Sequence, residues 1–159
     1  WIKQQSNGFF TLNEVPDAKN LWLLGTGTGI APFFSILNTD EPWQRFENIV
    51  LVHAVRTMTD LRYQEIVQSL QQKYAERFRF LAFISREEIE GTIKGRVPAA
   101  IENGELEKSV NLQLTLEDSQ IMLCGNPDMV KDTVKLLKAR GFSKNRRRTP
   151  GQITVENYW

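Results

Sequence analysis

The sequence predicts an α/β fold in which a doubly wound, mostly parallel sheet of five strands carries helices on both faces. Two observations predict it. Several apolar runs continue without polar interruption, which is typical of strands buried on both faces of a parallel sheet. Between these runs lie segments whose apolar residues recur at helical spacing, so strands and helices alternate along the chain. This alternation is the pattern of Rossmann-like domains.

The elements follow in order. Strands are expected at 20–24, 48–55, 78–84, 119–124 and, near the carboxyl end, within 152–159. Helices are expected at 30–38, within 61–78, around 98–102 and between 125 and 141. Pro32 suits the first turn of its helix, and Gly141 suits the end of the last one. The polar stretch 103–118 is expected to be a long surface excursion.

Composition narrows the function. The 159 residues include 41% hydrophobic side chains, enough for one core, and 20 basic against 19 acidic groups, so no global field indicates nucleic acid or membrane as partner. A single cysteine and a single histidine exclude an internal disulfide and a metal site built from these residues, and favour a cytoplasmic protein. No apolar run approaches a membrane span. The chain opens at Trp1 rather than at a methionine, which suggests a fragment of a longer polypeptide.

A glycine-rich loop, GTGTGIAP, enters the first helix and holds Gly25, Thr26, Gly27, Thr28, Gly29 and Pro32. Glycines at the carboxyl end of a strand let the backbone approach a ligand, and the following helix offers free N–H groups and a partial positive charge. Such a site suits a pyrophosphate. Glycines alone equally suit a tight turn, but the position after the first strand of an alternating fold favours a ligand.

A second loop, CGNPDM, holds Cys124, Gly125, Asn126, Pro127, Asp128 and Met129. Here too a strand stops and a proline begins a helix, so two helix N-termini are expected to face one crevice. By residue type, Cys124 is a small buried hydrophobe. No base can be named for it, because the only histidine, His53, lies inside a strand and is interpreted as a satisfied core or strand-end residue.

Taken together, these segments resemble a known family. The resemblance rests on GFFTLNEVP, GTGTGIAPFFSIL, LVHAVR, ISREE, GRVP, IENGELE, MLCGNPDMV and RRRTPGQITVENYW. They are similar to the nicotinamide-nucleotide half of the ferredoxin–NADP reductase family, and most similar to its bacterial flavodoxin/ferredoxin–NADP reductases. The resemblance implies an electron-transfer flavoprotein in which hydride passes directly between NADP(H) and FAD, so that catalysis is positioning plus electrostatics.

The resemblance also implies roles for particular residues. It places the Gly25 to Pro32 loop beside the nicotinamide and pyrophosphate, and the Cys124 to Met129 loop beside the nicotinamide near the flavin. Glu156 matches a carboxylate that plant-type members hold near the reacting flavin. The terminal Tyr158 and Trp159 match an aromatic ending that lies across the flavin, so stacking on an isoalloxazine or adenine ring is expected.

Arginines near the strand ends predict which nicotinamide cofactor is bound. An NAD-specific crevice often carries an acidic residue after the second strand, whereas this chain has Arg56, which cannot accept ribose hydroxyl hydrogens. Arg86, which follows Ser85 in ISREE, and Arg96 in GRVP lie farther along. Paired guanidinium donors suit a 2′-phosphate, and the resemblance assigns all three arginines to NADP. Taken singly, each is better interpreted as an ordinary solvated charge, but three of them near strand ends favour the phosphate.

The flavin half of the family carries an arginine-x-tyrosine-serine motif that is not found in these 159 residues. We therefore expect residues 1–12 to be the tail of a missing N-terminal FAD-binding barrel and residues 13–159 to be an NADP-binding domain. The expected partners are ferredoxin or flavodoxin and the FAD-binding domain of the same polypeptide. Alone, this pyridine-nucleotide half is expected to be inactive.

Two alternatives stay open. One is the NAD-linked reductase component of an oxygenase or of a flavohaemoglobin-like protein, which shares both glycine loops; the arginines and the YW ending speak against it. The other is a nucleotide-binding module without enzymatic activity.

The run Arg146, Arg147, Arg148 is a further basic feature. It lacks the surrounding basic excess and the interleaved aromatic residues of a nucleic-acid surface. A solvated loop or a docking surface for an acidic electron carrier is expected instead.

Overall fold

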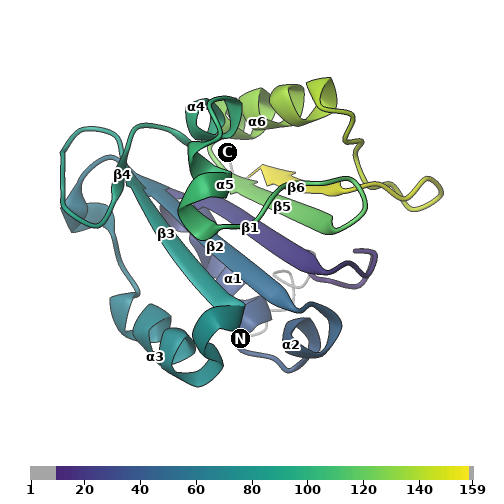
Figure 1. Cartoon of the computed structure of the whole chain (residues 1–159), viewed down its shortest axis with the longest axis horizontal. Helices are drawn as coiled ribbons and strands as arrows, with labels where there is room; N and C mark the ends of the chain where they lie inside the picture. The colour runs from purple at the N-terminus through teal and green to yellow at the C-terminus, as the bar shows by residue number, and fades with distance from the viewer. Residues whose placement is uncertain (1–9, 158–159) are drawn as a thin grey trace.

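The computed structural model describes residues 10–157, and they form a single parallel sheet covered by helices on both faces (Figure 1). The six strands are β1 (Asn20–Thr26), β2 (Asn48–Val55), β3 (Phe78–Ile84), β4 (Ile93–Lys94), β5 (Ser119–Gly125) and β6 (Ile153–Asn157). Every neighbouring pair of strands is parallel. The predicted fold class is confirmed, but the predicted count of five strands is wrong by one. The addition is β4, two residues within a polar stretch too short to show a periodicity.

The strand order is β4-β3-β2-β1-β5-β6, so the chain winds outward from β1 in one direction and then returns to continue from β1 in the other. The direction reverses between β1 and β5, which pair with each other, Gly25 lying opposite Cys124. In open parallel sheets the crossover connections diverge at this point and leave a crevice at the carboxyl ends of the strands. The two glycine loops meet there because each follows one of these two strands.

Helices α4, α5 and α6 cover one face of the sheet, and α1, α2 and α3 cover the other (Figure 1). Their bounds are α1 (Ala31–Leu37), α2 (Glu41–Arg45), α3 (Gln64–Tyr74), α4 (Val97–Glu102), α5 (Glu105–Val110) and α6 (Pro127–Ala139). Short 3₁₀ turns are η2 (Gly27–Ile30), η3 (Met58–Asp60) and η4 (Ala75–Arg77). The predicted helices are all present, although their ends differ by a few residues. Helix α2 was not predicted.

Successive residues of β1 supply the two cores alternately. Trp22 and Leu24 pack beneath α4, α5 and α6, whereas Leu21 and Leu23 pack beneath α1 and its neighbours. All four are fully buried. A strand whose two faces are both covered must be apolar at every position, which explains the uninterrupted run from which it was predicted.

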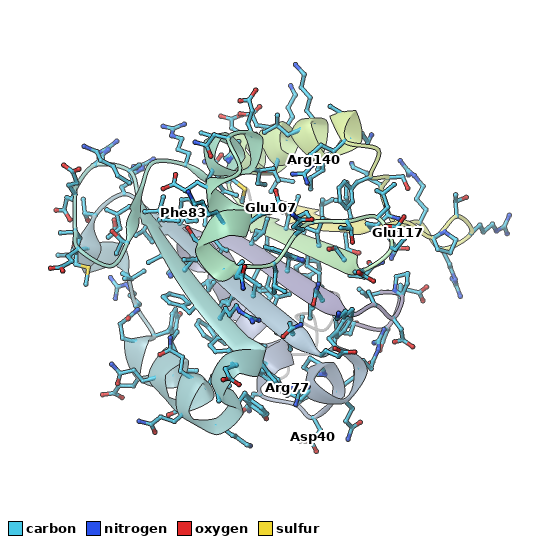
Figure 2. The ribbon with its side chains drawn as sticks, viewed as in Figure 1. Asp40, Arg77, Phe83, Glu107, Glu117 and Arg140 are labelled. Atoms are coloured by element: carbon cyan, nitrogen blue, oxygen red, sulfur yellow. The ribbon has the colours of Figure 1, made fainter. Side chains whose placement is uncertain are left out.

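The stretch 103–118 is not the surface excursion expected from its polarity. It contains α5, whose Leu106 and Val110 are buried in the core, as is Leu114 just beyond. Its polar groups are tied to the end of α6: both Nη atoms of Arg140 donate to the carboxylate of Glu107, at 3.0 and 3.2 Å (Figure 2). These three residues are spaced four apart, but only the first two lie within the six-residue helix, which is too few to establish a helical period from the sequence.

The amino-terminal segment also contributes to the core. Phe10 and Leu12 are buried among the residues under α1, and the ring centroid of Phe10 lies 5.7 Å from that of Phe33. The boundary expected after residue 12 stays a prediction.

Candidate functional site

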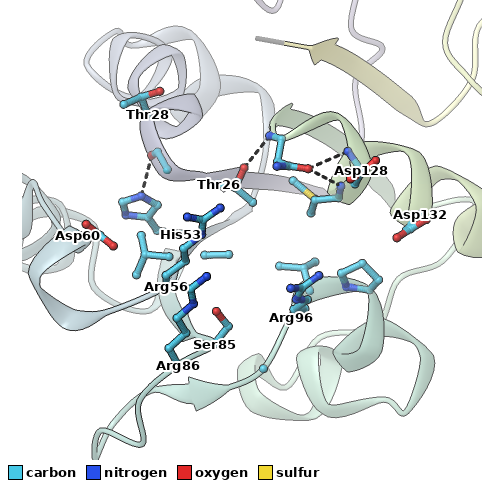
Figure 3. Close-up of a pocket in the computed structure, with 18 of the residues that line it drawn as sticks. Thr26, Thr28, His53, Arg56, Asp60, Ser85, Arg86, Arg96, Asp128 and Asp132 are labelled. Atoms are coloured by element: carbon cyan, nitrogen blue, oxygen red, sulfur yellow. Dashed lines mark hydrogen bonds between the residues drawn. The ribbon is translucent and has the colours of Figure 1, made fainter. Parts of the chain in front are cut away.

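A cavity of about 650 Å³ opens at the carboxyl ends of β1, β2 and β3, where the winding of the sheet reverses (Figure 3). Its wall is drawn from the loops after these three strands, from α4 and from the start of α6. The predicted residues that line it are Thr26, Gly27, Thr28, Arg56, Ser85, Arg86, Arg96, Asn126, Asp128 and Met129. Ligand pockets in proteins commonly range from about 300 to 1,000 Å³.

Each of the three positions in the first loop requires glycine for a different structural reason. Gly27 has a φ of 53°, and nothing lies within 4 Å of the position its Cβ would take, so its open side faces the cavity. A Cβ on Gly29 would lie 2.7 Å from Cα of Gly125, so Gly29 allows the two loops to touch. Gly25 allows close packing of the strand against Ile30, whose Cα would lie 3.2 Å from an added Cβ. Of the three, Gly27 borders the cavity.

The two loops are also joined by a hydrogen bond. The backbone N–H of Asn126 donates to Oγ1 of Thr26 at 2.8 Å. Gly125, with a φ of 133°, lies directly against Thr26, so no side chain fits there. Loops separated by a hundred residues in sequence are therefore held as one unit, as the placement of both at strand ends predicted.

The helical segments that follow the two loops differ in whether their first backbone N–H groups are capped by a side chain. Oδ1 of Asn126 accepts from the backbone N–H groups of Asp128 and Met129, at 2.8 and 3.3 Å. The N–H groups that α6 was expected to offer a ligand are therefore used by its own cap. The turn beginning at Gly27 has no side-chain cap, so its first N–H groups remain available to an anion.

His53, on β2, supports the glycine loop through a hydrogen bond. Its Nε2 lies 2.9 Å from the carbonyl oxygen of Gly27. A carbonyl can only accept, so Nε2 carries the proton, and the buried Nδ1 has no partner in the described part of the chain. Burial lowers the pKa of His53, although the bond to Gly27 and the charge of Asp60 oppose this shift. His53 is thus a neutral, loop-supporting residue, and the interpretation of it as a satisfied strand-end residue holds for one of its two nitrogens.

Arg56, Arg86 and Arg96 reach the same cavity from three different loops and are exposed (Figure 3). Within residues 10–157, none of these guanidinium groups makes a hydrogen bond or an ion pair; those recorded for arginines belong to Arg45, Arg77, Arg79 and Arg140. The three arginines at the cavity therefore differ from these four, whose guanidinium groups have partners in the described chain. Unpaired guanidinium groups around one hollow favour an anionic ligand.

The remaining predicted site residues lie off the cavity wall. Cys124 is fully buried in the core under α1, and Gly25, Gly29, Pro32, Gly125 and Pro127 shape the loops behind the wall. Burial, with a smaller contribution from Glu156, raises the pKa of the Cys124 thiol to about 12. It stays protonated at neutral pH and is no nucleophile. Glu156 lies opposite Cys124 in the pairing of β5 with β6. Tyr158 and Trp159 lie outside the described residues.

Several wall residues were not predicted. The main ones are Asp60, Arg62 and Tyr63, from the loop after β2, and Asp132, one turn after Asp128 on α6. Asp132 could have been found from its helical spacing to Asp128. The loop residues carry no signal in the sequence, because η3 and the left-handed Tyr63 decide how that loop folds back.

The described residues contain neither a membrane-spanning helix nor a cluster of metal-binding side chains. No helix among them is long and apolar enough to cross a membrane. Between residues 10 and 157, no group of three or more His, Cys, Asp or Glu side chains is placed to hold a metal ion.

The topology, the glycine turn and the arginine-lined cavity define a dinucleotide-binding type of α/β domain. The family described as oxidoreductase NAD-binding domain matches residues 23–135. The chain belongs to this family.

Named relatives cover the whole chain. A flavodoxin/ferredoxin–NADP reductase of Buchnera aphidicola (strain Sg) is 46% identical over 160 residues, and that of Escherichia coli is 46% identical over 159. The alignments cover 100% and 99% of this chain but only 62% and 64% of those relatives. A crystal structure of a ferredoxin NADP⁺ reductase from Neisseria gonorrhoeae with bound FAD and NADP has a TM-score of 0.89 and 37% identity, over 96% of this chain and 61% of that one.

Proposed function

We propose that this chain is the NADP(H)-binding part of a flavodoxin/ferredoxin–NADP reductase. In such an enzyme hydride passes between NADP(H) and FAD, and electrons pass to or from ferredoxin or flavodoxin. One observation carries the proposal: Arg56, Arg86 and Arg96 surround a single cavity without carboxylate partners in the described chain. A 2′-phosphate is the group that distinguishes NADP from NAD, and guanidinium donors match its geometry.

The residues present suit NADP. The turn at Gly27 presents uncapped backbone N–H groups and an open face, which suit the pyrophosphate, and Thr28 lines the same part of the wall. Ser85 and Arg86, side by side after β3, are proposed to hold the 2′-phosphate together with Arg96. We propose that Arg56 contributes charge to this same end of the cavity.

Catalysis would consist of positioning. The Cys124 thiol, with a pKa of about 12, has no nucleophilic role, and Glu156 on the neighbouring strand contributes charge without a covalent step. We propose that Glu156 and the loop from Cys124 to Met129 border the reacting rings and help to orient the nicotinamide, with the Cys124 side chain buried behind the loop. FAD supplies the hydride acceptor or donor when it is bound. We propose that it is held mainly by a domain that precedes this one, since the relatives extend well beyond the aligned region.

The first test is calorimetric titration of the chain with NADP⁺, NAD⁺ and 2′-phospho-AMP. We expect the two phosphorylated ligands to bind at least tenfold more tightly than NAD⁺, about 1.4 kcal/mol. Arg86→Ala should remove most of that preference. Equal affinity for NADP⁺ and NAD⁺ would contradict the NADP assignment.

A second candidate is an NAD-linked reductase. It is favoured by Asp60, which lines the cavity five residues after the end of β2 and whose carboxylate could accept ribose hydroxyl hydrogens. The same titration decides between the two candidates, because an NAD-linked protein would bind NAD⁺ at least as tightly as NADP⁺.

We further propose that the partner protein is acidic and binds the basic hairpin that holds Arg146, Arg147 and Arg148. All three side chains are exposed, and the hairpin is closed by two backbone hydrogen bonds between Arg146 and Thr149, each 3.0 Å. Ferredoxin and flavodoxin are the proposed partners. A cytoplasmic location stays a prediction from the single cysteine.

A further inference from the structure

A fourth arginine, Arg62, lines the cavity besides the three that the sequence predicted. It lies between η3 and α3 and its side chain is exposed. Like the other three, its guanidinium group makes no hydrogen bond or ion pair with another residue in the part of the chain that the structure describes. It therefore adds another unpaired positive charge at this site.

The backbone beside Arg62 is held in an unusual conformation. Tyr63 has a φ of 70°, in the left-handed region that is unfavourable for a bulky aromatic residue. It is held there by two contacts: its carbonyl accepts the N–H of Val67 at 3.1 Å, and its ring lies 4.9 Å from that of Phe34. Strained backbone conformations of this kind cost energy and persist only where the surrounding structure enforces them. They cluster at functional sites.

These contacts place Arg62 on the glycine-loop side of the cavity. Phe34 belongs to α1, which directly follows the glycine loop. Asp60, two residues before Arg62, is close enough to act on the pKa of His53, and His53 is bonded to Gly27 (Figure 3). By contrast, Ser85 and Arg86 lie side by side, and they and Arg96 lie on the side of the cavity away from Thr28, as Figure 3 shows.

The glycine loop itself lacks a charged group. Its turn offers only backbone N–H groups, and those at the start of α6 are taken by the side chain of Asn126. A pyrophosphate lying on this loop would carry two negative charges with no cation from the loop to balance them. A guanidinium group entering from the neighbouring loop after β2 would supply that balance.

We propose that Arg62 binds the pyrophosphate of the bound dinucleotide, while Arg86 and Arg96 serve the 2′-phosphate. This inference rests on the proposed function. It divides the arginines of the cavity between the pyrophosphate and the 2′-phosphate. Arg62 would then set affinity for NADP⁺ and NAD⁺ alike, without contributing to the choice between them.

The test compares single variants by calorimetric titration with NADP⁺, NAD⁺ and adenosine 2′-monophosphate, which lacks the pyrophosphate. Arg62→Ala should weaken NADP⁺ and NAD⁺ by the same factor, about tenfold, and leave adenosine 2′-monophosphate unchanged. Arg86→Ala should weaken NADP⁺ and adenosine 2′-monophosphate and leave NAD⁺ unchanged. Lys138→Ala, which removes the same charge from an exposed position in the last turn of α6, should change none of the three.

Two results would overturn the inference while the proposed function stands. The first is unaltered NADP⁺ affinity in Arg62→Ala, and the second is a loss of adenosine 2′-monophosphate binding equal to the loss for NADP⁺. If the unsubstituted chain binds none of these nucleotides, the proposed function fails and the role of Arg62 fails with it.

Discussion

His53 illustrates, at the scale of single residues, how burial decides what a side chain does. Its Nε2–H donates to the carbonyl of Gly27, and Nδ1 is enclosed without a partner in the described chain. Adding a proton to Nδ1 would place a charge in an apolar surrounding, which is why the pKa of His53 is lowered. A neutral imidazole on β2 therefore supports the folded glycine loop through this bond.

This lowered pKa predicts a pH-dependent stability. In the unfolded chain His53 takes up a proton near its ordinary pKa of about 6.5, while the folded chain resists protonation until lower pH. The free energy of unfolding should therefore be fully retained above about pH 6.5 and fall as the pH drops below it. Urea titrations at pH 7.5 and 5.5 measure the difference.

The matched variant is His53→Gln, whose side-chain amide can still donate to Gly27 but does not titrate. It should show a smaller loss of stability between the two pH values than the unsubstituted chain. An equal loss in both proteins would mean that groups other than His53 cause the pH dependence.

At the scale of elements, one residue at the start of α6, Asn126, has two structural roles. Asn126 caps the helix through its side chain and joins the helix to Thr26 through its backbone N–H. Pro127 follows at the first helical position, where its missing N–H leaves no donor unsatisfied. The order of residues in this loop is thus dictated by the helix as well as by the cavity.

Removing the cap should destabilise the domain. We expect Asn126→Ala to lower the free energy of unfolding by about 1 kcal/mol, because two N–H groups of the first turn lose their acceptor. Asn126→Asp keeps an acceptor of the same length and should cost much less. Urea denaturation of both variants provides the measurement, and equal losses for Ala and Asp would show that the cap is not the cause.

At the scale of the whole molecule, the cavity and the basic hairpin lie at opposite ends of the sheet (Figure 1). The hairpin precedes β6, so it projects from the amino ends of the strands. It is held firmly: Nδ2 of Asn145 donates to the carbonyl of Glu14 at 2.7 Å, and Oδ1 of Asn145 accepts the N–H of Gly151 at 3.1 Å. Its arginines are thereby displayed beside the chain segment that enters the domain.

This arrangement predicts a salt-sensitive effect on association. Replacing Arg146, Arg147 and Arg148 by alanine should lower the association rate with ferredoxin or flavodoxin at low salt and have little effect at high salt, because steering by exposed charges is screened. Stopped-flow fluorescence with a labelled carrier measures the rate. The matched control replaces three exposed lysines of α6, Lys131, Lys135 and Lys138. Equal rates in the two triple variants would contradict a docking role for the hairpin.

Much of the architecture was predictable because its signals are local. The runs at 48–55 and 78–84 match β2 and β3 at both ends, since a strand covered on both faces is mostly apolar and stops where polar residues follow. Helix α5 and strand β4 were missed for the opposite reason. Each is too short for a periodicity, and each forms only because the neighbouring elements provide a surface to pack on or a strand to pair with.

By itself, the sequence determined the alternation of strands and helices, the two glycine loops and the arginines near the strand ends, since these depend on residue types at short spacing. Only the tertiary structure decided that Gly29 touches Gly125, that the backbone N–H of Asn126 donates to Thr26, and that Arg62 reaches the cavity. These features join segments far apart in the chain. They depend on how the loops pack against one another at the point where the sheet reverses, and short-range patterns carry no record of that packing.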